Sequence, residues 1–176
     1  KSLLWLMTAI MIVFCIQKMN REAYQLWYIA LSAPAIVFGI AGSFIEGLGG
    51  LGGSLVKYLS SRRINIVLSI LLGLASLALS VGSNLWITIA AQVLIAVVSG
   101  ALLFHFTAQI QHQLPSRYRT GSGSVINAVG RIVLMPLTFV FGVLSNQSVF
   151  IAGWMLVVLS GLAIFVQLKL DEQASP

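Results

Sequence analysis

The sequence predicts an all-α membrane protein with six transmembrane helices, and three observations lead to this fold class. Hydrophobic residues make up 59% of the 176 residues, only 8% are charged, and the mean hydropathy is +0.99. A soluble domain carries roughly 25% charged residues because its surface faces water. The apolar residues also lie in long runs, and a helix needs about 20 such residues to cross a bilayer. We therefore expect the apolar surface to face lipid.

We predict the six spans at residues 2–28, 34–56, 64–81, 85–110, 121–144 and 149–168. The first is uniformly apolar only over residues 2–16, and its second half mixes polar and apolar residues at helical spacing. No basic-then-apolar pattern with a small-residue cleavage site marks it as a secretory leader, so we expect a span. The other runs are apolar over most of their length, and short segments connect them. The chain is predicted to be one six-helix domain over residues 1–176, with residues 169–176 as a cytoplasmic tail.

Basic residues indicate how these spans are oriented. Six spans place both termini on one side, and that side collects Lys1, Lys57, Arg62, Arg63, Arg117, Arg119 and Lys169. The connections on the other side, residues 82–84 and 145–148, contain no Lys or Arg. Basic segments are retained in the cytoplasm during insertion. We therefore expect a multi-pass protein of the cell membrane, a bacterial inner membrane, with both ends of this chain cytoplasmic.

The polar stretch HQLPSRYRTGSGS lies between the fourth and fifth runs and is predicted to be a cytoplasmic hairpin. Pro115 disfavours helix at the residue before it. Ser122 or Ser124 is expected to cap the N-terminus of the fifth helix. Gly121 and Gly123 allow close packing or a tight turn.

Two segments resemble the major facilitator superfamily of transporters. LPSRYRTGSGSVINAVGRIVLMPLTFVFGVLS is similar to the join between the tenth and eleventh helices of that family. The matching positions are Pro115, Arg119, Thr120, Gly121 and Pro136. GGSLVKYLSSRR resembles the basic loop between the eighth and ninth helices of the family. Its matching positions are Gly53, Lys57, Arg62 and Arg63. The acidic residue that the family carries in this loop is missing, so the resemblance does not extend to a charge relay there.

The resemblance covers essentially the whole chain, as the second half of such a transporter. Members of the family have twelve helices in two six-helix halves, with the substrate bound at the interface. The resemblance therefore implies a half-bundle fold and a small-molecule substrate. The partners that it implies are membrane lipids and an N-terminal six-helix half of the same transporter. The seventh helix of the family lines the central cavity, and residues 2–28 occupy its place in this chain.

The second part of the first span carries a polar stripe. At 100° per residue, one face of a helix collects Gln17, Asn20, Arg21, Tyr24, Gln25 and Tyr28. Lys18 and Glu22 lie beside the stripe, one turn apart. A water-filled cavity entering from outside the cell would produce this pattern, as the resemblance also implies. The alternative is a helix that leaves the membrane early and places Lys18 and Arg21 on lipid headgroups.

The fifth span carries a second stripe, which includes Asn127, Arg131 and Thr138. Arg131 lies roughly 15 Å along the helix from Gly121, too deep to reach the near surface easily. It is a candidate for attracting an anionic substrate, or a structural charge paired with a carboxylate. Pro136 removes a backbone hydrogen bond and is expected to kink the helix.

Glu46 in the second span and Glu22 in the first are the acidic residues well inside the apolar runs. A carboxyl group in such a position is a candidate proton carrier, with Glu46 first and Glu22 second. The alternative for Glu46 is a permanent ion pair with Lys18, Arg21 or Arg131.

Other residues of the spans also have two interpretations. His105 in the fourth span is a third candidate for proton transfer, or a hydrogen-bonded packing residue. In the second span, Gly49-x-x-x-Gly53 and Ser43-x-x-x-Gly47 are small-residue patterns that let helix backbones approach closely. We expect these glycines to serve packing rather than binding.

Together these residues predict a secondary active transporter that moves a small solute by alternating access, coupled to protons. The surplus of basic residues in the spans favours the export of anionic or amphipathic compounds. The predicted substrate-binding residues are Gln17, Asn20, Arg21, Tyr24, Gln25, Asn127 and Arg131, and the predicted proton-coupling residues are Glu46, Glu22 and His105. The residues suggest no nucleophile–base pair or metal constellation, and Cys15 is the single cysteine, so we expect no enzyme, cofactor, metal or nucleic-acid partner. The alternative function is a non-transporting six-helix receptor or assembly protein.

Overall fold

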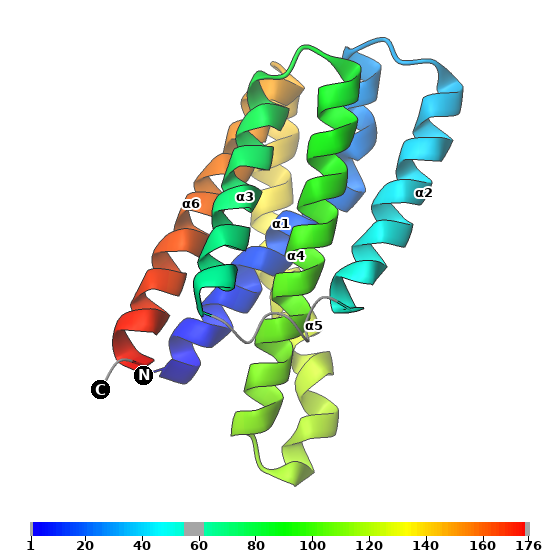
Figure 1. The fold of residues 1–176 in the computed structure, drawn as a ribbon. Helices are drawn as coiled ribbons and strands as arrows, with labels where there is room; N and C mark the ends of the chain where they lie inside the picture. Colours follow the sequence, from blue (N-terminus) through cyan, green and yellow to red (C-terminus); the bar gives the residue numbers. More distant parts are fainter. Residues whose placement is uncertain (1, 55–61, 175–176) are drawn as a thin grey trace.

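The computed structural model describes residues 2–54 and 62–174, and within those ranges every regular element is a helix (Figure 1). The helices are α1 (Ser2–Ala30), α2 (Ala35–Leu51), α3 (Arg62–Val81), α4 (Leu85–Gln113), α5 (Ser116–Ser145) and α6 (Val149–Ala174). All six are long and apolar enough to cross a membrane, so the prediction of a helical protein with six candidate membrane spans is confirmed for the described residues. Outside the described residues lie Lys1 and Lys57, and also the side chains of Arg62, Arg63, Arg119, Thr120 and Ser122.

The helices alternate in direction, so α1 begins and α6 ends at the same end of the bundle (Figure 1). α2 ends and α3 begins at this end, and α4 and α5 meet there. Arg117, near the start of α5, and Lys169, near the end of α6, lie toward it, and we call it the basic end. The turns from α1 to α2, from α3 to α4 and from α5 to α6 lie at the opposite end. The two predicted sides of the membrane therefore correspond to the two ends of the bundle.

α1 ends in a turn that two backbone hydrogen bonds close. The N–H of Ser32 donates to the carbonyl of Ile29 at 3.0 Å, and the N–H of Ala33 donates to that of Tyr28 at 2.9 Å. Ser32 has a φ of 52°, the left-handed conformation typical of such helix C-termini. Pro34 follows and cannot extend the helix, because it lacks a backbone N–H. The chain therefore reverses within a few residues and enters α2.

The connection between α4 and α5 is much shorter than predicted, because only Leu114 and Pro115 separate the two helices. Ser122 and Ser124 lie inside α5, so the prediction that one of them caps this helix is wrong. Pro115, with a φ of −55°, takes the position before the first turn. Proline suits a helix start because its φ is fixed and no backbone donor is needed there. The two glycines beside the serines disfavour helix by only about 1 kcal/mol each, which does not delay the start.

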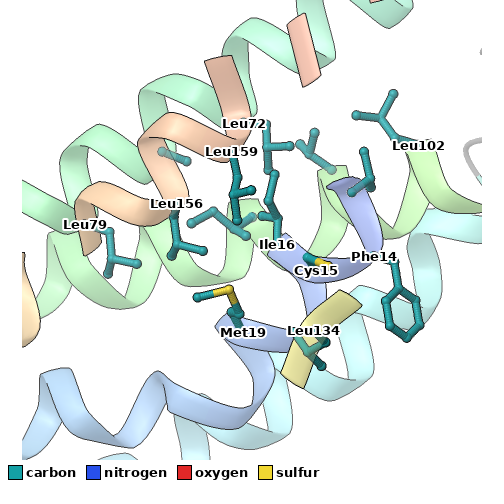
Figure 2. Close-up of a cluster of buried hydrophobic side chains, with 14 of the residues drawn as sticks. Phe14, Cys15, Ile16, Met19, Leu72, Leu79, Leu102, Leu134, Leu156 and Leu159 are labelled. Atoms are coloured by element: carbon teal, nitrogen blue, oxygen red, sulfur yellow. The ribbon is translucent and has the colours of Figure 1, made fainter. Parts of the chain in front are cut away.

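The buried core lies mainly between α1, α3, α4 and α6 (Figure 2). Its members include Cys15, Ile16 and Met19 of α1, Leu72 and Leu79 of α3, Leu102 of α4, and Leu156 and Leu159 of α6. In the most apolar window of each helix, 50% of the residues are buried in α1 and 56% in α4, but only 17% in α2 and in α5. α1 and α4 are thus the central helices, whereas α2 and α5 expose most of their surface.

Glycines bring α2 close to α4. A Cβ on Gly53 would lie 3.3 Å from the ring of Phe104, and Gly49 approaches the backbone of the same helix. The predicted packing role is therefore confirmed for the Gly49-x-x-x-Gly53 pattern. Gly47 has no neighbour within 4 Å of its Cβ position among the described residues, and Ser43 is exposed. The second pattern therefore makes no such contact in the part of the chain that the structure describes.

Candidate functional site

The polar stripe predicted on α1 divides between the protein interior and the open side, which is the exposed surface of α1 between α2 and α5. Asn20 is fully buried, and its Nδ2 donates to the backbone carbonyl of Gln92 on α4 at 3.0 Å. Arg21 and Gln25 are exposed, and Gln17 is half-buried. At 100° per residue the stripe is about 140° wide, so its two edges face different surroundings. The candidate binding residues of α1 therefore do not all face one cavity.

Gln92 joins α1 to α4, although its only signal in the sequence is a single amide within an apolar run. The hydroxyl of Tyr28 donates to its Oε1, and its Nε2 donates to the carbonyl of Tyr24 at 3.3 Å. Gln92, Asn20 and Tyr28 are all fully buried. These hydrogen bonds fix the rotation of α1 about its own axis. They thereby direct Arg21 toward the open side.

Arg21 and Glu46 form an ion pair between α1 and α2. Nε and Nη2 of Arg21 contact different carboxylate oxygens of Glu46, which is a bidentate geometry. The two side chains are 44% and 50% exposed, so the pair lies on the open side and not in the core. The sequence allowed Glu46 to be a proton carrier or to form an ion pair with one of three cations, and the structure contains the ion pair with Arg21. Tyr24 also reaches α2, where a Cβ on Gly42 would lie 2.6 Å from the tyrosine hydroxyl.

A second charged group lies between α1 and α5. Lys18 and Glu22 of α1 and Arg131 and Thr138 of α5 line a pocket of about 400 Å³. α5 also supplies the apolar wall of this pocket, through Leu134, Met135 and Phe139. The Nζ of Lys18 lies 5.8 Å from the centroid of the Phe14 ring. Within the described part of the chain, no ion pair joins Lys18, Glu22 and Arg131.

The structure therefore brings part of the predicted site together. Lys18, which is half-buried, and Arg21 and Glu22, which are exposed, lie on one arc of α1. Glu46 meets this arc from α2 and Arg131 from α5. Arg131 is about 22 Å from either end of α5 at 1.5 Å per residue, and it is exposed. Asn127, one turn earlier on α5, is also exposed but does not line the pocket. α5 continues as one helix through Pro136.

His105 lies apart from these groups, between α4 and α3. Its Nε2 hydrogen-bonds the side-chain amides of Asn65 on α3 at 3.1 Å and of Gln109 on α4 at 2.9 Å. The ring is buried, and it contacts the ring of Phe106 in a tilted arrangement with the centroids 5.8 Å apart. This is the environment expected of a hydrogen-bonded packing histidine. The structure does not place His105 beside Glu46 or Glu22.

The open side carries charged side chains on helices that are otherwise mainly apolar. Within the described ranges, no group of three or more His, Cys, Asp or Glu side chains is placed to hold a metal ion. Comparison with protein-family models, with curated proteins and with solved structures finds no match for this chain. The interpretation of the site therefore depends on its own geometry.

Proposed function

We propose that this chain is the second six-helix half of a major-facilitator-type transporter, which moves a small solute across the membrane by alternating access. An N-terminal six-helix half supplies the other wall of the solute pathway, and both ends of this chain are cytoplasmic. The transport is coupled to protons and exports anionic or amphipathic compounds. The six apolar helices and the resemblance of the segments around Pro115 and Arg62 support this proposal.

The main support for this proposal is the group of five charged side chains on the open side. Lys18, Arg21, Glu22, Glu46 and Arg131 all lie within helices that are apolar enough to span the membrane. A charged side chain at the bilayer centre costs about 2.5–3.5 kcal/mol on insertion scales, so such residues face a cavity or a partner. A water-lined pathway against a second half accommodates all five. The exposed faces of α2 and α5, which flank these charges, supply the surface on which that half docks.

The Arg21–Glu46 ion pair supplies the proton coupling in this proposal. While Glu46 is ionised, the pair holds α1 to α2. Protonation of Glu46 removes the charge attraction, which frees Arg21 for an anion and lets α2 move relative to α1. Glu22, the neighbour of Arg21 in the chain, is the second candidate carrier.

A cysteine at Thr138 is expected to react with a membrane-impermeant maleimide in the intact protein, because thiolates form in water and not in lipid. The matched control is Val158→Cys on α6, which is 62% exposed at a comparable depth. Both variants are made with Cys15→Ala, and labelling is measured in intact cells and in inverted vesicles. We expect Thr138→Cys to be labelled and Val158→Cys to be unlabelled. Equal labelling of the two cysteines would contradict a water-lined open side.

Replacing Glu46 with glutamine is expected to lower coupled flux about tenfold, because the amide keeps the shape but carries no titratable proton. The intact protein is reconstituted with a pH-sensitive dye trapped in the vesicles, and a panel of organic anions is tested for solutes that drive proton movement. Glu172→Gln, near the end of α6, is the control substitution of another glutamate and is expected to preserve the flux. If no anion drives proton movement, or if Glu46→Gln matches the wild type, a non-transporting receptor or assembly protein is favoured instead.

A further inference from the structure

We propose that the pocket between α1 and α5 binds an amphipathic monoanion. Its acidic head lies between Lys18 and Arg131, and its apolar body lies along Met135 and Phe139. That this anion is the transported solute rests on the proposed function, whereas its binding does not.

A close contact between the two helices places the cations together. A Cβ on Gly130 would lie 2.8 Å from the ring of Phe14, so the missing side chain lets α5 pack directly on α1. Arg131 follows Gly130 in the chain, and Lys18 lies one turn beyond Phe14 on α1. The Nζ of Lys18 lies over the same Phe14 ring. The contact therefore brings both cations to one pocket and holds Lys18 by a cation–π interaction.

The net positive charge of the residues that line the pocket favours an anionic ligand. Lys18 and Arg131 are cationic and Glu22 is the single carboxylate in the lining, so one positive charge is uncompensated. Charged side chains within membrane-spanning helices face a partner of opposite charge or a cavity, and one bound negative charge neutralises this excess. The guanidinium of Arg131 also presents paired N–H donors that can bind two oxygens of a carboxylate or sulfonate group. The hydroxyl of Thr138 already donates to the carbonyl of Leu134 at 3.0 Å, which leaves binding of the head to the two cations.

The apolar walls of the pocket favour a ligand with an apolar tail. Met135 and Phe139 are 70% and 74% exposed and lie one turn apart on α5. Leu134, which is buried, forms the floor beside them. A ligand with an acidic head and an alkyl or aryl tail covers this surface while it neutralises the charge. A free solute and an acidic lipid share this chemistry.

The test measures binding of octanesulfonate, which stays ionised at every accessible pH, to the intact protein in phosphatidylcholine nanodiscs by calorimetry. Arg131→Gln is expected to weaken binding about tenfold and Lys18→Gln about threefold, because each removes an attractive charge. Glu22→Gln is expected to tighten binding about threefold, because it removes a repulsive one. Arg117→Gln, which removes a cation at the basic end, is the matched control and should bind like the wild type. Octanol, which has the same tail without the charge, should bind far more weakly.

Opposite effects of the Glu22 and Arg131 substitutions support the site, because misfolding would weaken binding in both. Unchanged affinity in Arg131→Gln, or loss of affinity in Glu22→Gln, would overturn it. Nanodiscs with added phosphatidylglycerol identify the source of the anion: competition with the probe indicates a lipid in this site, and no competition indicates a free solute. Loss of flux with the Glu46 variant together with unchanged probe binding in Arg131→Gln would overturn this inference and leave the transport proposal standing.

Discussion

Replacing Gly52 with alanine is expected to lower the free energy of unfolding by about 2–3 kcal/mol, the upper part of the range for overpacked sites. A Cβ on Gly52 would lie 2.7 Å from the backbone nitrogen of Ala101 and 2.7 Å from the carbonyl oxygen of Val97. These are backbone atoms of α4, so they cannot turn aside as the end of a side chain does. Gly52 has a φ of −51° and a ψ of −34°, which alanine adopts readily. The loss therefore arises from the collision alone.

The measurement is unfolding of the intact protein by dodecyl sulfate in mixed micelles, followed by circular dichroism. Gly47→Ala is the matched control, because Gly47 lies in α2 just before Gly52, with nothing within 4 Å of its Cβ position among the described residues. We expect the control to be neutral or slightly stabilising, since alanine favours helix over glycine by about 1 kcal/mol. Equal stability of Gly52→Ala and the control would contradict the close contact between α2 and α4.

A glycine of α4 also makes the contact between α2 and α4 close. A Cβ on Gly100 would lie 2.6 Å from the carbonyl oxygen of Gly49. Lipid tails are as apolar as the helices, so close backbone packing of this kind replaces the hydrophobic effect as the force between them. This crossing, together with the close contact of Gly42 with Tyr24 on α1, places α2 and therefore Glu46 relative to Arg21. The glycines of α2 thus position one member of the ion pair without touching it.

The number of the spans, and their limits at the end opposite the basic end, could be predicted because they depend on local composition. Long apolar runs satisfy their backbone hydrogen bonds only as helices in lipid. The limits of α4 and α5 at the basic end were predicted less well, because HQLPSRYRTGSGS is polar and contains glycines. Such a stretch can remain helical beyond the apolar region. Pro115 interrupts the helix at one point only, and α5 begins directly after it.

The partners of the polar side chains could be predicted only in part. Helical spacing placed Asn20 and Arg21 on one stripe, but spacing does not say which edge of a wide stripe meets another helix. Gln92 was not singled out, because a single amide in an apolar run produces no periodic pattern. The ion pair between Arg21 and Glu46 was one of several pairings that charge alone allowed. The choice among them depends on how α2 packs, which is set by shape.

Replacing Gln92 with leucine is expected to lower the free energy of unfolding by about 2 kcal/mol. The substitution removes two side-chain hydrogen bonds and leaves the buried hydroxyl of Tyr28 without its acceptor. Hydrogen bonds between membrane helices average about 0.6 kcal/mol and reach about 1.7, and an unsatisfied buried group costs about 1–3 kcal/mol. Gln111→Leu, an exposed position on the same helix, is the control and should change stability by less than about 0.5 kcal/mol.

A second substitution separates the hydrogen bond from the change of shape. Tyr28→Phe removes the hydroxyl and keeps the ring, which packs edge-to-face on Phe38 at 5.6 Å between centroids. Once the hydroxyl is gone, Gln92→Leu no longer leaves a buried donor without an acceptor. The loss of unfolding free energy in the double variant should therefore be about 1 kcal/mol smaller than the sum of the two single losses. Strictly additive losses would mean that the two side chains do not interact. In that case the rotation of α1, and with it the direction of Arg21, would have to be set by packing alone.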